Sequence, residues 1–146
     1  MRLVAEFLSD EWIRALGAAA RAAYAARDAD AEVLVVEPVV RDVPGRGEIR
    51  YRVTCDTTVR DVTGPSPHDA PADVRLETDY PTAAALARGE VNAQHALADG
   101  RLTVSGDVAR LAGHASAIAK LGDLFAALRA TTSFPAPADR AAEPRS

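Results

Sequence analysis

The segment from Glu48 to Arg60 constrains the fold of this chain most, because two kinds of side chain alternate along it. The less polar set is Ile49, Tyr51, Val53, Cys55, Thr57 and Val59, and the polar set is Glu48, Arg50, Arg52, Thr54, Asp56 and Arg60. Successive side chains of a strand point to opposite faces of its sheet. The alternation therefore predicts an antiparallel sheet with one covered face and one solvent-exposed face. The segment is either one long bent strand or a hairpin that turns near Asp56–Thr57.

Further strands are predicted before and after this segment. Residues 33–43 are apolar enough for a strand, and the sequence Pro44-Gly45-Arg46-Gly47 after them indicates a turn. Residues 64–71 are predicted to be a loop, since the prolines within them cannot donate hydrogen bonds to a sheet. Two short strands follow, at residues 74–78 and at residues 102–104.

Helices are predicted wherever a short polar side chain that can act as an N-cap precedes a helical pattern. These N-caps are Ser9, Asp79, Asn92 and Asp107. The four helices are expected to end near Arg27, at Gly89, at Gly100 and near Ala130.

The order of these elements favours the α+β class, because strands and helices are partly segregated along the chain instead of alternating strictly. With 146 residues the chain is long enough for one domain with a hydrophobic core. We expect that domain to span residues 1–130. Residues 131–146 are rich in proline and alanine and are predicted to form a disordered tail.

Charge and cysteine content exclude several classes of protein. The net charge of −4 argues against a nucleic-acid partner, whose phosphates are bound by clustered cations. No segment approaches the roughly 18 uninterrupted apolar residues of a membrane-spanning helix. Cys55 is the only cysteine and cannot form an internal disulfide, so we expect a reducing compartment, the cytoplasm.

The residue types that carry catalysis or bind metals do not form a convincing set. His68 lies in Ser66-Pro67-His68-Asp69, but the members of a catalytic triad normally come from separated segments that fold together, so we expect a solvated loop there. His95 and His114 have no second histidine or cysteine at metal-ligand spacing. Glycine-rich phosphate loops are absent from the sequence. The sequence therefore predicts no catalytic residue, no metal and no cofactor.

One segment resembles a known family. Residues 73–107 read DVRLETDYPTAAALARGEVNAQHALADGRLTVSGD. They resemble the core of the sterol carrier protein 2 family, in which a strand runs into a T-D-Y-x-T-A-x-x-L-x-x-G helix and a second helix precedes G-R-L-x-V-x-G-D. The matching residues are Asp73, which leads the strand, and Thr78, Asp79, Tyr80, Thr82, Ala83, Leu86, Gly89, Gly100, Arg101, Leu102, Val104, Gly106 and Asp107. The start FLSDEW is similar to that of bacterial stand-alone members. A glycine that members often carry near the second hairpin is missing from Cys55–Thr58.

The resemblance implies a five-stranded, mostly antiparallel sheet with helices on one face and an apolar tunnel between them. It further implies binding or carriage of a fatty acyl, lipid or sterol-like molecule, without chemistry. On this basis the candidate lining residues are Trp12, Leu16, Leu86, Val91, Leu97, Leu102, Val104, Leu121, Phe125 and Leu128. Each of them would equally serve as plain core.

Two other functions remain open at this point. The chain could be a structural or dimerisation module of a larger enzyme system, which would pair with a second copy through an apolar face of the last helix. It could also be an enzyme that uses the pocket for its substrate, with His95 or His114 as the base.

Overall fold

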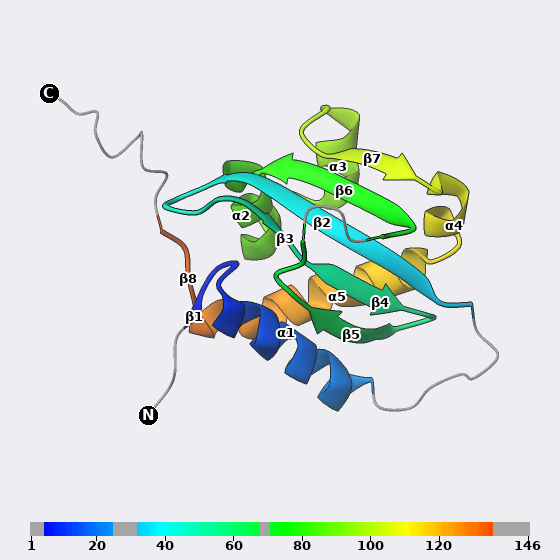
Figure 1. Cartoon of the computed structure of the whole chain (residues 1–146), viewed down its shortest axis with the longest axis horizontal. Coiled ribbons are helices and arrows are strands. Elements are labelled where there is room, and N and C mark those ends of the chain that lie inside the picture. The colour runs from blue at the N-terminus through cyan, green and yellow to red at the C-terminus, as the bar shows by residue number, and fades with distance from the viewer. Residues whose placement is uncertain (1–4, 25–31, 68–70, 136–146) are drawn as a thin grey trace, which may run out of the picture.

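The computed structural model describes residues 5–24, 32–67 and 71–135, which form a sheet with helices packed against one of its faces (Figure 1). The strands are β1 (Ala5–Glu6), β2 (Leu34–Val43), β3 (Gly47–Arg50), β4 (Arg52–Cys55), β5 (Val59–Thr63), β6 (Val74–Asp79), β7 (Thr103–Gly106) and β8 (Thr132–Ser133). The helices are α1 (Asp10–Ala23), α2 (Tyr80–Arg88), α3 (Ala93–Ala98), α4 (Val108–Ala112), α5 (Ala115–Leu128) and the 3-10 turn η1 (Arg129–Thr131). The predicted α+β class is confirmed.

The main sheet has six strands in the order β5-β4-β2-β6-β7, with β3 also paired to β2. Of the strand pairs described in this sheet, β2–β6 is the parallel one and the others are antiparallel. The sheet is therefore mostly antiparallel, as predicted. Its strand count exceeds the predicted five because Tyr51 separates β3 from β4, and both of these strands run antiparallel to β2.

The alternating segment is a hairpin, which settles the choice that the sequence left open. The chain turns at Asp56–Thr58, where Asp56 Oδ1 accepts hydrogen bonds from the Thr58 amide at 2.9 Å and the Thr58 hydroxyl at 3.2 Å. Thr57 lies in this turn and is exposed, so it does not share the covered face predicted for it. A register shift follows in the hairpin, where Cys55 pairs with Val59.

All four predicted N-caps are confirmed by a hydrogen bond from the backbone to the capping side chain. Ser9 accepts from the Trp12 amide at 3.1 Å, and Asp79 accepts from the Thr82 amide at 3.0 Å. Asn92 accepts from the His95 amide at 2.8 Å, and Asp107 accepts from the Arg110 amide at 3.2 Å. Gly89 ends α2 with φ 78°, a conformation that glycine adopts without strain. The end predicted for the first helix, near Arg27, lies outside the described residues.

The single helix predicted over residues 108–130 is wrong, because the structure breaks it at Gly113–His114 into α4 and α5. In a continuous helix the His114 amide would donate to the Arg110 carbonyl. Here Nδ1 of the His114 ring lies 2.8 Å from the Arg110 carbonyl oxygen and takes the place of the amide. The His114 amide donates to the Leu111 carbonyl instead.

The C-terminal segment folds against the domain as far as it is described. β8 pairs in parallel with β1, with Ala5 opposite Thr132. Beyond β8, the Phe134 ring lies 5.0 Å from that of Phe7, and the Tyr80 hydroxyl donates to the Pro135 carbonyl at 2.6 Å. Residues 131–135 thus pack onto the domain, although the sequence assigned them to a tail, and residues 136–146 lie outside the described residues.

The hydrophobic core lies between the sheet and the helices, where α1, α2 and α5 meet the inner side chains of the strands. The opposite face of the sheet carries a buried carboxylate, that of Glu37, which is 0% exposed. It accepts from Arg75 Nε at 2.6 Å, and Arg50 Nη1 and Ser66 Oγ lie at 3.4 Å. Through Ser66 this cluster ties the loop after β5 to the sheet.

Candidate functional site

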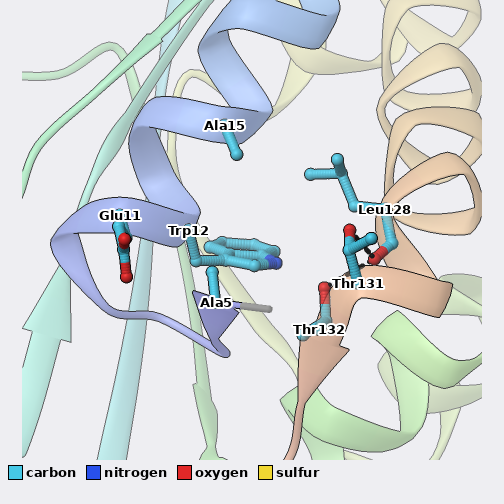
Figure 2. A pocket seen from close by; sticks show the side chains of 7 residues that line it. All are labelled: Ala5, Glu11, Trp12, Ala15, Leu128, Thr131 and Thr132. Atoms are coloured by element: carbon cyan, nitrogen blue, oxygen red, sulfur yellow. Dashed lines mark hydrogen bonds between the residues drawn. The ribbon is translucent and has the colours of Figure 1, made fainter. Parts of the chain in front are cut away.

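A groove opens where the first turns of α1 face the C-terminal end of α5 and the segment that follows it (Figure 2). Its volume is about 180 Å³. The lining residues are Ala5, Glu11, Trp12, Ala15, Leu128, Thr131 and Thr132. The short β1–β8 pair brings the two ends of the domain together at this groove.

The Trp12 indole forms the inner wall of the groove and is held in place by aromatic neighbours. It stacks on Phe125 with ring centroids 5.9 Å apart and an interplanar angle of 30°. Phe7 and Tyr51 meet it edge-on, at 4.9 Å and 5.9 Å. Edge-on and offset stacked rings attract each other beyond the effect of their burial. The indole is therefore fixed, and it is only 2% exposed.

The polar groups of the groove are few. Among the described residues, none accepts a hydrogen bond from the Trp12 indole N–H, whose edge points toward Leu128, Thr131 and Thr132 in Figure 2. The hydroxyls of Thr131 and Thr132 both donate to the Leu128 carbonyl, at 3.2 Å and 2.7 Å. An apolar cavity with a small number of placed polar groups is the usual form of a small-molecule site.

The structure brings together half of the candidate lining residues predicted from sequence. They gather where α1 meets α5: Trp12, Leu16, Leu121, Phe125 and Leu128. Leu16 and Leu121 are buried in the core, at 0% and 6% exposure. Trp12 and Leu128 also line the groove, and Phe125 supports it from behind through the stack with Trp12.

The other candidates lie away from this groove. Val104 sits opposite Leu76 in the β6–β7 pair, half-buried against the core. Leu102 is buried before β7, whereas Leu97 on α3 is 42% exposed. Leu86 and Val91 are half-buried and do not belong to the core cluster. The predicted set therefore falls into two separate groups.

The sequence did not identify the remaining residues of the groove, namely Ala5, Glu11, Ala15, Thr131 and Thr132. The two adjacent threonines after the last helix carried the one available signal, since β-branched residues favour strands. The proline- and alanine-rich composition of residues 131–146 places these threonines in the predicted tail instead.

The residues that the sequence analysis weighed for metal binding or catalysis can be placed where the structure describes them. No group of three or more His, Cys, Asp and Glu side chains in the described ranges could hold a metal ion. Burial raises the pKa of Cys55 to about 11, with the charges of Asp56 and Asp73 adding to the effect, so this thiol stays protonated at neutral pH. His95 is exposed on α3, His114 binds two backbone carbonyls, and His68 lies outside the described residues.

Comparison with known proteins identifies the family. The sequence model of the SCP-2 sterol transfer family matches residues 21–120. The chain belongs to this family. Two solved structures support the fold. A sterol carrier protein 2 has 21% identity and a TM-score of 0.62, and the match covers 82% of this chain and 97% of the other. A conserved protein of Thermus thermophilus, described as possibly a sterol carrier protein, has 23% identity and a TM-score of 0.63, and the match covers 94% of this chain and 99% of the other.

A search of the curated proteins gives no significant match. Within the part of the chain that the structure describes, no helix of this SCP-2 family member is long and apolar enough to cross a membrane.

Proposed function

We propose that this SCP-2 family member binds or carries a hydrophobic small molecule, such as a fatty acyl, lipid or sterol-like compound, and performs no chemistry on it. The observation that carries the proposal is the apolar groove beside Trp12, which leads to the α1–α5 contact. Binding there would be driven by removal of apolar ligand surface from water, worth about 25 cal/mol per Å². A buried, free Cys55 supports the further proposal of a cytoplasmic location.

The volume of the groove defines how binding would occur. Pockets for drug-sized ligands span about 300–1,000 Å³, whereas this groove measures about 180 Å³. A complete lipid would therefore require α1 and the end of α5 to move apart, which would extend the groove toward Leu16 and Leu121 and produce the tunnel predicted from the family. Ala15 on the α1 wall leaves space for this because its side chain is small.

The alternative is a structural or dimerisation module that pairs through the last helix. The large hydrophobic residues exposed in the described ranges are Val33, Leu97 and Val108. None of these lies on α5, so they do not form the apolar face on the last helix that this alternative requires. We therefore prefer the ligand-binding function.

Filling the groove tests the proposed function. We expect the neutral apolar dye Nile red to bind the wild-type chain with a rise in its fluorescence. Ala15→Leu should weaken this binding about tenfold, because the larger side chain occupies the groove. Ala18→Leu makes the same change on the exposed side of α1 and should leave binding unaltered. Absence of dye binding to the wild-type chain, or equal binding by both variants, would contradict a ligand site in this groove.

A further inference from the structure

The groove presents an unused hydrogen-bond donor at its inner wall. The Trp12 side chain is almost completely buried, yet its indole N–H has no acceptor among the described residues. A ligand that covered this N–H without accepting from it would leave it unsatisfied, whereas a ligand with an acceptor there would avoid that cost. The hydroxyl protons of Thr131 and Thr132 are already donated to Leu128. Among the described side chains that line this groove, Trp12 is therefore the one that still offers a donor.

The charge of the groove has one sign. Among the described residues that line it, Glu11 in the first turn of α1 is the only charged one, and none is basic. A carboxylate or phosphate on a ligand would therefore meet a like charge and, among the described lining residues, no cationic partner. A hydroxyl would find both partners that it needs, because it can accept from Trp12 and donate to the threonine oxygens, which lie on the side that the indole N–H faces.

We propose that the groove selects amphiphiles whose polar end is an uncharged hydrogen-bond acceptor, such as a hydroxyl, ester or ketone, over amphiphiles that end in a carboxylate or phosphate. This inference rests on the proposed function and narrows it to a ligand class. The polar end would lie at the Trp12 N–H, and the apolar part would extend between α1 and α5. Ligand selection would then follow from the arrangement of one donor and one acidic side chain.

Decan-1-ol and decanoate at pH 8 form a matched pair of probes for this inference, because they share a chain length and differ in the polar end. Trp12 is the only tryptophan, so its fluorescence and its single indole N–H resonance report on the groove directly. We expect decan-1-ol to bind at least about tenfold more tightly than decanoate and to shift the indole proton downfield, as a new hydrogen bond does.

The role of Glu11 is tested by Glu11→Gln against Asp10→Asn, which removes the same charge from the same helical turn outside the groove. Glu11→Gln should strengthen decanoate binding about fivefold and leave decan-1-ol unchanged, because only the anion is repelled. Asp10→Asn should change decanoate binding less than twofold.

Equal affinities for the two probes in a chain that still binds Nile red would overturn the selectivity and leave the proposed function intact. An unmoved indole resonance in the decan-1-ol complex, or an equal gain in decanoate binding by both charge variants, would overturn it as well. If neither probe nor the dye binds, the proposed function fails and the selectivity fails with it.

Discussion

The ring of Phe125 stacks on the indole of Trp12 at 5.9 Å and joins the end of α5 to the beginning of α1. Both residues were predicted from sequence to line a ligand site. Their contact is the point at which α1 and α5 would have to separate for a large ligand to enter. It is therefore both a stabilising contact and the structural element that would control access.

Removing the Phe125 ring should destabilise the domain and loosen the groove. Full truncation of a buried phenylalanine costs about 3–5 kcal/mol; because Phe125 is half-buried, we expect about 2 kcal/mol for Phe125→Ala. Urea unfolding followed by Trp12 fluorescence measures this change. Asp123→Ala, at an exposed position of the same helix, is the control and should stay within about 0.5 kcal/mol of the wild type. A similar loss in both variants would argue against a specific role of the stack.

His114 should make stability depend on pH. Its Nδ1 lies 2.8 Å from the Arg110 carbonyl and its Nε2 lies 3.1 Å from the Glu32 carbonyl. Carbonyl oxygens only accept, so both bonds require the doubly protonated ring. The bond to Arg110 raises the pKa of His114 above its ordinary value of 6.5, burial and the Arg110 charge oppose the rise, and the Glu32 carbonyl and carboxylate add to it.

The direction in which stability changes with pH follows from the raised pKa of His114. The folded state binds the proton more tightly than the unfolded chain, so the stabilisation is complete below pH 6.5 and is lost as the pH rises through the folded-state pKa. Chemical denaturation from pH 5.5 to 8.5 should show this loss, and His114→Gln should remove it. The charged groups beside the cluster are Arg110 and its ion-pair partners Glu32 and Asp73. His95→Gln is the control, and a wild-type profile without this loss would contradict the prediction.

Replacement by alanine should change the stability of the domain in opposite directions at Gly17 and at Gly122. A Cβ at Gly17 would lie 2.5 Å from the Val62 carbonyl oxygen, so α1 would have to move off β5. We expect Gly17→Ala to cost about 1–3 kcal/mol, the usual effect of overpacking. Gly122 lies inside α5 with nothing within 4 Å of such a Cβ. Gly122→Ala should therefore stabilise by about 0.5–1 kcal/mol through helix propensity. Thermal unfolding of both variants checks the pair, and a loss at Gly122 would be the unexpected result.

The buried carboxylate of Glu37 should contribute more to stability than the partly exposed carboxylate of Glu77. Glu37→Gln removes the charge that Arg50 and Arg75 share and should cost about 3 kcal/mol, in the range for breaking a buried ion pair. Glu77→Gln removes a partly exposed carboxylate 3.9 Å from Arg41, for which we expect less than about 1 kcal/mol. Urea midpoints measure both, and equal effects would show that burial of Glu37 is not the deciding factor.

The features that could be predicted from sequence are those determined by neighbouring residues. Ser9, Asp79, Asn92 and Asp107 cap helices because each needs only an amide three residues later. The alternation around Val53 indicates a sheet because its period belongs to the strand itself. These local signals, with the motif over residues 73–107, were sufficient for the fold class and the family.

The features that could not be predicted depend on contacts between distant residues. The His114 ring, which contacts the Arg110 carbonyl at the break between α4 and α5, is also held by the carbonyl of Glu32, 82 residues away in the chain. The groove depends on the pairing of β1 with β8. This pairing is only two residues long, so no periodic pattern in the sequence predicts it. Hence Trp12 and Leu128 could be predicted as apolar lining residues, whereas Ala5 and Thr132 could not.

Native mass spectrometry of the chain purified from its own host tests ligand carriage most directly. We predict a complex heavier than the polypeptide by the mass of one apolar molecule, which is released on mild activation and is reduced in Ala15→Leu relative to Ala18→Leu. A bare polypeptide mass, together with no binding of Nile red by the same preparation, would contradict ligand carriage by this protein.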